Sequence, residues 1–583
     1  MKKYISLLVI GLISFSISSF AQYATLYPSS WFVGMKWNKV QVIVKGGYDG
    51  FKKEQIKVTY PGVQLQKVHS FENGKYVALD LLISANAKPG DVLIEFIHDY
   101  KVHAVYWPLR ARRKGIGKTF AQGVTNKDFV YLLMPDRFSN GDITNDRWDA
   151  YKDTNVNRTT PITRHGGDLQ GIINHLDYFN ELGVTALWLT PVLENDMPLE
   201  NEQAGMVAGY HGYWFTDHYA VDKRFGGDDA YKKLVNAAHA KGIKIVQDAV
   251  YNHVGIEHWM YKDAPSKDWV NQWNQYTSSN HREEALMSMY GSEADKKVML
   301  DGWFVPHLPD VNQRNPYVAN YLIQHALWTV EEFGIDGWRV DTYKYCDEAF
   351  LNKVNAALEK DFPTITIVGA INKPFAWTEG VNKLYMTLAQ DLLYKAPEKN
   401  WIFLDNHDME RFVSVIGEDM NKYKMGMSLL FTLRGTPHLY YGTEIWMKNF
   451  KDPNDGMVRL DFPGGFPGDK ENKFVGSGRT EQENTAFDYV KKLANFRKLH
   501  PALQNGKMMQ FLPKDGLYVY FRYDEKETVM CVLNTGSKAK EINLNDYAER
   551  TKKFTSAANI ISGKNVGNKF SVDAKETLVL LLQ

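Results

Sequence analysis

The sequence is poor in cysteine, in net charge and in long apolar runs. Cys346 and Cys531 are the only cysteines among 583 residues, and they fall in segments that we assign to different domains. This scarcity excludes a disulfide framework and predicts two buried free thiols. The formal charge of +1 argues against nucleic acid or an anionic membrane as the main partner. After residue 17, no run reaches the roughly 18 apolar residues that a membrane-spanning helix requires.

The first 21 residues have the pattern of a secretory signal peptide. Lys2 and Lys3 precede the apolar run ISLLVIGLISFSI at 5–17, and the small residues of Ser-Phe-Ala predict cleavage after Ala21. Loss of the two lysines would change the formal charge from +1 to about −1. The next residue is Gln22 rather than cysteine, so we predict no lipid anchor. We expect secretion across the inner membrane to the periplasm.

What the sequence does contain is enough apolar material for several packed domains, with 44% hydrophobic residues. Residues 22–122 hold short β-like runs separated by Gly, Pro and Asn, which predict an N-terminal β-sandwich domain. These runs lie at 39–47, 55–63, 75–83 and 91–107.

Residues 123–505 have a different organisation, in which apolar strand-like runs are divided by amphipathic helical stretches. One such helix is predicted at 169–183, ending at Gly183. Buried strands that alternate with helices indicate an α/β fold with a parallel sheet, and the length favours a (β/α)8 TIM barrel. The strand-like runs lie at 128–138, 184–192, 243–253, 335–341, 364–370, 400–408 and 437–444.

Two further regions complete the domain prediction. The long connection between the third and fourth barrel strands predicts a protruding subdomain within about 254–310, followed by a helix. Residues 506–583 return to a β pattern and predict a C-terminal antiparallel domain. Its clearest element is a hairpin at 516–536 that turns at Asp-Glu-Lys.

Polar side chains follow the ends of several barrel strands, on the face where such barrels place active sites. The GWRVD segment at 337–341 separates Arg339 and Asp341 by two positions, so both point to the same side of the strand. A guanidinium there would keep the carboxylate ionised. Taken alone, this spacing more often marks a structural salt bridge. The other polar residues at strand ends are Asp248, Asn252, His253, His407 and Asp408.

In this order, the segments resemble the conserved regions of the α-amylase superfamily of glycoside hydrolases. The matching segments are DAVYNH (248–253), LPDVN (308–312), GWRVD (337–341) and NHD (406–408). The YHGYW (210–214) and RLDFPGG (459–465) segments and the predicted sandwich resemble the neopullulanase and cyclomaltodextrinase branch, above all secreted bacterial neopullulanases of starch utilisation.

The resemblance implies a retaining hydrolase of α-1,4-glucosidic links in maltodextrins, pullulan, cyclodextrins or starch fragments. Its partners would be α-glucan oligosaccharides, with no nucleic acid, and the resemblance allows a homodimer. Asp341 matches the nucleophile of a covalent intermediate, Arg339 the cation beside it and Asp408 the carboxylate that holds ring hydroxyls. The matching substrate-binding residues are His211, Tyr213, His253 and His407.

An Asx-rich segment after the first barrel strand is a candidate Ca²⁺ site. By spacing alone, NGDITND at 140–146 would be an ordinary turn. The resemblance implies a structural Ca²⁺ ion, for which oxygen ligands are suited. The implied ligands are Asn140, Asp142, Asn145, Asp146 and Asp168, with a backbone carbonyl near Gly166.

The general acid of the family is missing. In the family a glutamate follows the glycine that ends the fifth strand, whereas here Ala370 follows Gly369. Gly369 and His407 are 38 positions apart, but two helices, two strands and their loops need about 45 or more. We therefore predict that the region of the sixth strand is absent. Nothing in the sequence around Glu379 supports it as a replacement acid.

Two other hypotheses stand beside an active hydrolase. The chain could be a non-catalytic α-glucan-binding protein on a degenerate barrel, or a defective copy that does not fold cooperatively. The presence of Arg339, Asp341 and Asp408 favours an active lineage. Absence of the sixth strand predicts displaced inward residues, and a displacement of about 1 Å can cost roughly a hundredfold in rate. On this reasoning, both maltotriose and a substrate that needs no proton donor, such as α-maltosyl fluoride, are expected to fail.

Overall fold

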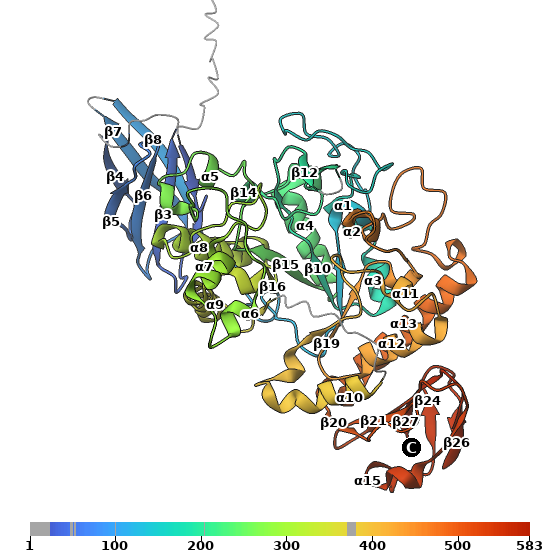
Figure 1. Ribbon diagram of the computed structural model, residues 1–583. Helices are drawn as coiled ribbons and strands as arrows, with labels where there is room; N and C mark the ends of the chain where they lie inside the picture. The colour runs from blue at the N-terminus through green and yellow to red at the C-terminus, as the bar shows by residue number, and fades with distance from the viewer. Residues whose placement is uncertain (1–23, 47–50, 52–53, 99–100, 203–204, 370–380) are drawn as a thin grey trace, which may run out of the picture. The chain divides into compact units, whose positions relative to one another are not determined.

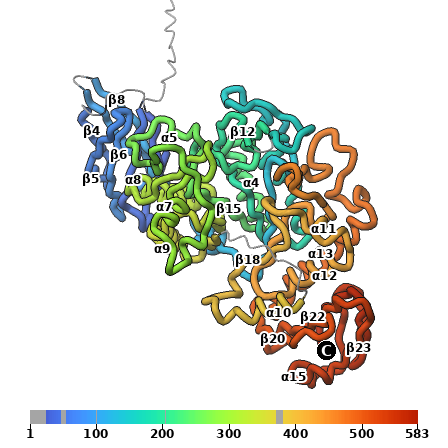
Figure 2. Tube along the Cα trace, in the orientation of Figure 1, coloured from blue at the N-terminus to red at the C-terminus, as the bar shows by residue number. Residues whose placement is uncertain are grey.

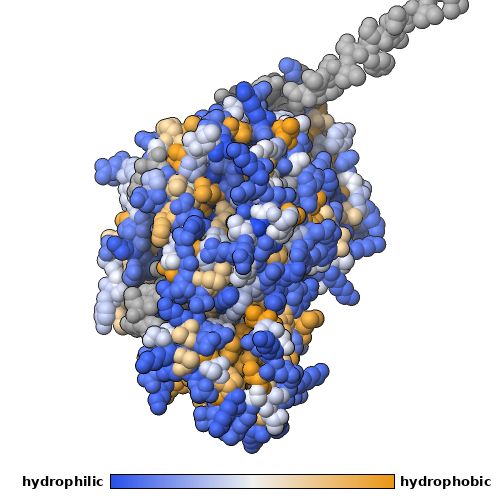
Figure 3. Space-filling view, turned by 90° about the vertical axis from the view of Figure 1, so that its right-hand side faces the viewer, coloured by the Kyte–Doolittle hydropathy of each residue, from blue (hydrophilic) through white to orange (hydrophobic). Residues whose placement is uncertain are grey.

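The computed structural model describes residues 24–583, except 47–50, 52–53, 99–100, 203–204 and 370–380. The predicted signal peptide, Ala370 and Glu379 therefore lie outside the described residues. The chain divides into two compact units, Met1–Gly34 with Asn38–Ala111 and Met35–Trp37 with Arg112–Gln583. Among the helices described, none combines the length and apolar character needed to cross a membrane. The face drawn in Figure 3 is mostly hydrophilic.

The first unit is a β-sandwich of two four-stranded sheets, as the sequence predicts (Figure 1). One sheet has the order β1 (Ala24–Tyr27), β3 (Lys39–Gly46), β6 (Tyr76–Ile83) and β5 (Val63–Ser70). The other has the order β2 (Trp31–Phe32), β8 (Lys101–Arg110), β7 (Gly90–His98) and β4 (Gln55–Thr59). Successive side chains of β7 point to opposite faces of the sheet, and Val92, Ile94 and Phe96 form its inner face, where they are fully buried.

The second unit is built around a seven-stranded parallel sheet, the curled sheet of a (β/α)8 barrel (Figures 1 and 2). Each of the seven strand-like runs in the sequence supplies one strand. The spatial order is β17 (Thr366–Gly369), β16 (Gly337–Asp341), β15 (Lys244–Val250), β10 (Ala186–Leu189), β9 (Val130–Leu133), β19 (Thr436–Tyr440) and β18 (Trp401–Ile402).

The sheet has two edges, β17 and β18, and the described residues between them contain no strand. Every residue of β17 and β18 is half-buried, whereas every residue of β9, β10 and β19 is buried. The only α-helix described in this interval is α10 (Val381–Ala389). The described sheet thus fits the prediction that the region of the sixth strand is missing.

Helices alternate with the strands along the chain, and α4 (Gly227–Ala240) shows the pattern of one buried face, with Tyr231, Leu234, Val235 and Ala238 buried. The single helix predicted at 169–183 is wrong in one respect, because it is broken at His175 into two. His175 has φ −112 and ψ 16, outside the helical range, and Gly183 ends the second helix in the left-handed conformation. The helices are α1 (Pro135–Phe138), α2 (Leu169–Asn174), α3 (Leu176–Leu182), α4 (Gly227–Ala240), α8 (Pro316–Phe333), α9 (Glu348–Asp361), α11 (Phe412–Val415), α12 (Met420–Thr432), α13 (Glu481–Leu499) and α14 (Pro501–Gln504).

Long connections leave the sheet at two places. After β10 come the strand pairs β11 (Leu193–Glu194) with β14 (Asp217–Val221) and β12 (Glu200–Glu202) with β13 (Gly205–Val207). After β15, the predicted excursion contains only short helices, α5 (Trp259–Lys262), α6 (Glu284–Met287) and α7 (Glu293–Asp301).

The C-terminal region is an antiparallel β domain around an apolar core that includes Phe521, Met530 and Leu580. The predicted hairpin is present as β21 (Leu517–Tyr523) and β22 (Thr528–Asn534). The remaining elements are β20 (Lys507–Gln510), β23 (Lys540–Asn543), α15 (Ala548–Thr551), β24 (Ala557–Asn559), β25 (Asn565–Val566), β26 (Lys569–Val572) and β27 (Thr577–Leu582). Both cysteines are buried free thiols, as predicted.

Candidate active site

The centre of the candidate site is one arginine that serves two carboxylates. Arg339 and Asp341 project to the same side of β16, as their spacing predicts. Nη1 of Arg339 lies 2.8 Å from Oδ1 of Asp341 and also 2.9 Å and 3.0 Å from the two carboxylate oxygens of Asp248 on β15. Residues 339 and 248 are paired in the parallel register of β15 and β16, which explains why Arg339 also reaches the carboxyl group of Asp248.

Asp248 is held by further donors from neighbouring elements. Its Oδ2 accepts hydrogen bonds from Tyr213 Oη at 2.9 Å and from Trp188 Nε1 at 3.1 Å. The guanidinium of Arg339 lies over the Trp188 ring, 4.8 Å from its centroid. Both Asp248 oxygens are engaged, so this carboxyl group positions Arg339 and Tyr213 rather than facing a substrate.

A second group follows β18 and meets the first through Tyr213. The Tyr213 hydroxyl lies 3.0 Å from Nε2 of His407, and the two rings are stacked, with centroids 5.6 Å apart and planes 8° apart. The backbone N–H of Tyr213 donates to Nδ1 of His211 at 3.1 Å. Three of the sequence-predicted substrate-binding residues therefore form one connected network with Arg339 and Asp341.

Asp408 borders this network and remains 38% exposed at its side chain. Nη2 of Arg459 lies 3.0 Å from Asp408 Oδ1, and Nε2 of His407 lies 3.4 Å from Oδ2. Nζ of Lys451 donates to the backbone carbonyl of Asp408 at 3.1 Å and pairs with Asp455. The exposed carboxylate edge is thus available to accept hydrogen bonds from a ligand.

The three carboxyl groups of the site, those of Asp248, Asp341 and Asp408, differ in how their surroundings shift their pKa values. Burial raises the pKa of Asp248 to about 7, although Arg339 opposes the rise. Burial also raises the pKa of Asp341 above its ordinary value, and Arg339 again acts in the opposite direction. Burial would raise the pKa of Asp408 as well, but His407 and Arg459 together lower it to about 2. Asp408 is therefore a carboxylate at any pH near neutrality.

His253 lies apart from the hydrogen-bonded network. Its ring is buried and stacked on Phe304 at 5.5 Å, and its Nε2 has no hydrogen-bond partner among the described residues. Burial lowers its pKa to about 3, so the imidazole is neutral. A neutral ring with an open nitrogen can serve a sugar hydroxyl, the role implied by the resemblance.

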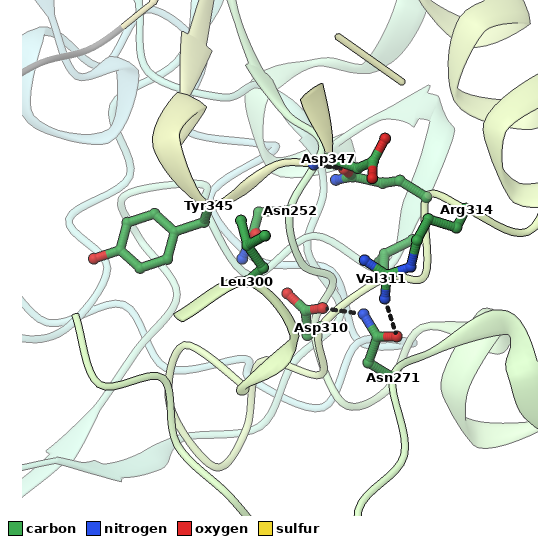
Figure 4. Close-up of a pocket in the computed structure, with 9 residues that line it drawn as sticks. Asn252, Asn271, Leu300, Asp310, Val311, Arg314, Tyr345 and Asp347 are labelled. Atoms are coloured by element: carbon green, nitrogen blue, oxygen red, sulfur yellow. Dashed lines mark hydrogen bonds between the residues drawn. The ribbon is translucent and has the colours of Figure 1, made fainter. Parts of the chain in front are cut away.

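A small polar cavity of about 10 Å³, the room of a single water molecule, is lined by residues that include Asn252, Asp310 and Tyr345 (Figure 4). Asp310 accepts a 2.6 Å hydrogen bond there from Asn271, which in turn accepts one from Arg314. Burial raises the pKa of Asp310 well above its usual range. The cavity is too small for a sugar, so it is not the substrate pocket.

The predicted Ca²⁺ residues meet in the loop between β9 and α2, with one exception. Asp168 accepts hydrogen bonds from the N–H groups of Gly141, Asp142 and Gly171, and Asn140 Nδ2 donates to Asp146 at 2.8 Å. The Asp142 side chain is exposed and accepts instead from Thr144, so the structure does not bring its carboxylate into the cluster.

The side chains of this loop that could serve a cation are amides and carboxylates. Within the described ranges, no group of three or more His, Cys, Asp or Glu side chains could hold a metal ion. However, Oδ1 of Asn140 and Oδ1 of Asn145 are buried without a hydrogen-bond partner. A Cβ at Gly166 would lie 2.9 Å from the Asp146 carboxylate, so glycine is required there. Burial raises the pKa of Asp146 to about 6. Unpaired oxygens beside a destabilised carboxylate fit a hard cation.

Sequence reasoning missed the supporting charges and rings. Arg459 lies in the RLDFPGG segment used for the resemblance, but nothing local shows that it would pair with Asp408, 51 positions away. The sequence gives no indication, beyond positions within or after barrel strands, that three further residues belong to the site: Trp188, Lys451 and Asp455. A charge spaced four residues from another, as in Asp455 and Arg459, was the only available hint.

Comparison with known proteins decides the family. Residues 132–365 and 350–474, more than half of the chain, match the alpha amylase catalytic domain. The chain belongs to the alpha-amylase family. Residues 25–113 of this glycoside hydrolase match the cyclomaltodextrinase N-terminal domain, and residues 508–581 match the cyclo-malto-dextrinase C-terminal domain.

Curated relatives of this alpha-amylase family member are similar at moderate identity. A cyclomaltodextrinase of Geobacillus thermopakistaniensis is 29% identical over 449 residues, which cover 71% of the chain and 70% of the relative. Neopullulanase 2 of Thermoactinomyces vulgaris is 28% identical over the same length. The match to a beta/alpha-amylase of Paenibacillus polymyxa, 29% identical, spans only 36% of that longer protein.

Solved structures show the same fold. An Anoxybacillus alpha-amylase has a TM-score of 0.63 at 28% identity and covers 78% of this chain and 98% of its own. An alpha-amylase from Geobacillus thermoleovorans, solved with acarbose, has a TM-score of 0.62 at 26% identity and covers 79% and 99%.

Proposed function

We propose that this family member binds α-1,4-linked glucan chains and attacks them with Asp341 as the nucleophile of a retaining mechanism. The relatives named cyclomaltodextrinase, neopullulanase and maltogenic alpha-amylase support an α-glucan as substrate. The observation that carries the proposal is the shared arginine. Arg339 contacts Asp341 at 2.8 Å and ties it to the Asp248–Tyr213–His407 network, with the exposed edge of Asp408 beside it.

Each group has a defined task in the proposed mechanism. Arg339 stabilises Asp341 as a carboxylate against the effect of burial, so that an oxygen of Asp341 can attack the anomeric carbon. Asp408, with its low pKa, accepts hydrogen bonds from sugar hydroxyls as positive charge develops on the ring. The half-buried ring of Tyr213 supplies an apolar surface for the same glucose.

We further propose that the proton donor for the leaving oxygen is missing. Ala370 follows β17 where the family has its acid, and a methyl group cannot protonate a sugar oxygen. The family match falls into two parts that overlap at 350–365, just before β17, which supports a discontinuity there. General acid catalysis commonly contributes about 10²–10⁴-fold. Hydrolysis of ordinary maltodextrins by this chain is therefore expected to be very slow.

A Ca²⁺ ion is part of the proposal as a structural component. Asn140, Asn145, Asp146 and Asp168 would hold it, and it would stabilise the loop between β9 and α2. When bound, it supplies positive charge that neutralises the crowded carboxylates of the loop. Secretion to the periplasm is proposed from the N-terminal pattern.

The test uses a substrate whose leaving group needs no proton. With α-maltosyl fluoride, attack by Asp341 forms the ester bond to the anomeric carbon and releases fluoride as an anion. Breakdown of the ester by water is also slow without the missing acid–base group. We expect fluoride release and an intact-protein mass increase of one maltosyl unit, because the nucleophile network is complete in the described residues. Maltotriose should give neither.

The Asp341→Asn variant is the matched control and should give no adduct. Hydrolysis of maltotriose at a rate close to that of the fluoride would show that a proton donor is present. Binding of maltotriose without any adduct from the fluoride would favour the alternative function, a glucan-binding protein on a degenerate barrel.

A further inference from the structure

The loop after β19, which reaches the backbone of Asp408 through Lys451, carries an exposed aromatic side chain. Phe450 is 53% exposed and makes no ring contact with the other described aromatic side chains. Large apolar side chains at the surface are common, so exposure alone assigns no role. What distinguishes Phe450 is how firmly its backbone is attached to the segment that follows Asp408.

The chain is fixed on both sides of Phe450. The carbonyl oxygen of Asn449 accepts a hydrogen bond from the N–H of Arg411 at 3.2 Å. The N–H of Lys451 donates to Oε2 of Glu410 at 2.5 Å. Arg411 itself is buried, and its guanidinium donates to the carbonyl oxygens of Val458 and Tyr441. The backbone on both sides of Phe450 is therefore held by Glu410 and Arg411, which follow Asp408 closely in the chain.

Polar groups connect this ring to the pocket. Nζ of Lys451 donates to the Asp408 carbonyl at 3.1 Å and lies 2.8 Å from Asp455. Asp455 in turn lies 3.2 Å from Arg459, the partner of Asp408. The side chains of Asp408, Lys451 and Asp455 are 38%, 36% and 45% exposed, so the loop after β18 and the loop after β19 both offer polar atoms to solvent.

We propose that Phe450 contacts substrate by stacking on a glucose unit next to the one held at Asp408. A pyranose ring has an apolar face of C–H groups and a rim of hydroxyls, so it needs an aromatic surface with charged groups beside it. Phe450 supplies the surface, and Lys451 and Asp455 supply the charged groups. A ring on a fixed backbone loses little conformational freedom on binding, which favours affinity. This inference rests on the proposed function, because it requires that α-glucans occupy the pocket.

The experiment measures binding, so it does not depend on the missing acid. Calorimetric titration with maltoheptaose is carried out on the full chain and on the variants Phe450→Ala, Phe450→Leu and Phe450→Trp. We expect the dissociation constant to be about three- to tenfold larger for Phe450→Ala, which corresponds to the free energy of one aromatic contact. Phe450→Leu should be weakened as well, because it keeps apolar area but not the ring face. Phe450→Trp should bind at least as tightly as the native chain.

Tyr394→Ala is the matched control. Tyr394 is 57% exposed, an aromatic of similar exposure, but it precedes β18 and so lies at the opposite end of that strand from Asp408, which follows it. Its substitution should leave the dissociation constant unchanged. Equal binding by Phe450→Ala and the native chain would overturn the Phe450 inference alone. Failure of the native chain to bind maltoheptaose would overturn the proposed function, and the inference with it.

Discussion

At the scale of single residues, the site is dominated by buried groups whose ionisation is set by their surroundings. The clearest case is His438 on β19, which lies inside the sheet against Trp188, with ring centroids 4.9 Å apart. Its Nε2 has no hydrogen-bond partner among the described residues, and burial lowers its pKa to about 3. The folded protein therefore keeps this imidazole neutral.

The low pKa of His438 predicts a loss of stability in acid. Below about pH 6.5 the unfolded chain binds a proton at this position, whereas the folded chain does not until about pH 3. Across that window the folded state loses up to about 1.4 kcal/mol per pH unit from this residue. His438→Phe should therefore lose less stability between pH 7.5 and pH 5 than the native chain. Urea unfolding at the two pH values measures the difference, and equal losses in both proteins would contradict the prediction.

At the scale of elements, the loop between β9 and α2 combines two features that rarely persist without a ligand. Two asparagine oxygens are buried and unpaired. In addition, burial raises the pKa of the Asp146 carboxyl group to about 6, and the neighbouring Asp168 adds to the rise. An unpaired buried polar group costs about 1–3 kcal/mol. The loop therefore gains most from a bound cation when its carboxylates are ionised.

Removal of Ca²⁺ should lower the melting temperature. An ion that binds only the folded state at 100 times its dissociation constant stabilises it by about 2.7 kcal/mol, so excess EDTA should lower the transition by several degrees. The shift should be larger at pH 7.5 than below pH 6, where Asp146 takes up a proton. Asn145→Ala should remove the EDTA effect. A melting curve unchanged by EDTA, with metal-free protein confirmed by elemental analysis, would eliminate the site.

At the scale of the whole second unit, the described strands form a sheet with two edges, whereas a closed barrel has none. Strands β17 and β18 are half-buried throughout. Large apolar side chains are exposed in the stretch before β18, and these are Met386, Leu392, Leu393 and Tyr394. Surface of this kind fits a sheet that lacks one strand and the elements around it.

Restoring a family-length segment between β17 and α10, with a glutamate after Gly369, should recover maltodextrin hydrolysis. The added strand would pair with both edges and bring the acid to the same face as Asp341. Ala370→Glu alone should not recover it, because one residue adds a carboxyl group but leaves both edges unpaired. The measurement is release of reducing sugar from maltotriose by the two variants. Strong activity from the single substitution would show that the barrel is already closed.

The displacement of the inward residues, which the missing strand predicts, is not seen in the contacts between neighbouring strands of the sheet. The contacts among Tyr213, Asp248, Arg339 and Asp341 arise on β10, β15 and β16, or on the loop after β10, which are neighbours in the sheet. These strands pair without the missing one. His407 follows the edge strand β18 and still reaches Tyr213. For this reason Asp341, the proposed nucleophile, can keep its contacts under the proposed loss of the proton donor.

The sequence by itself was sufficient for those features that depend on neighbours in the chain. Alternating and continuous apolar runs predicted the sandwich and all seven barrel strands, and a spacing of two placed Arg339 and Asp341 on one side of β16. Strand and helix periodicity are local properties, so they can be read without knowing the fold. The short interval after Gly369 was likewise a matter of counting residues.

Only the tertiary structure decided how charges are shared. Arg339 donates hydrogen bonds to both Asp341 and Asp248, and Arg459 donates to Asp408, 51 positions away in the chain. Both arrangements depend on which strands and loops become neighbours in the fold. The break at His175 and the turn of Asp142 toward Thr144 are also results of packing. Burial and long-range Coulomb interactions act through space, and the distances through space are set by the fold, not by the order of residues along the chain.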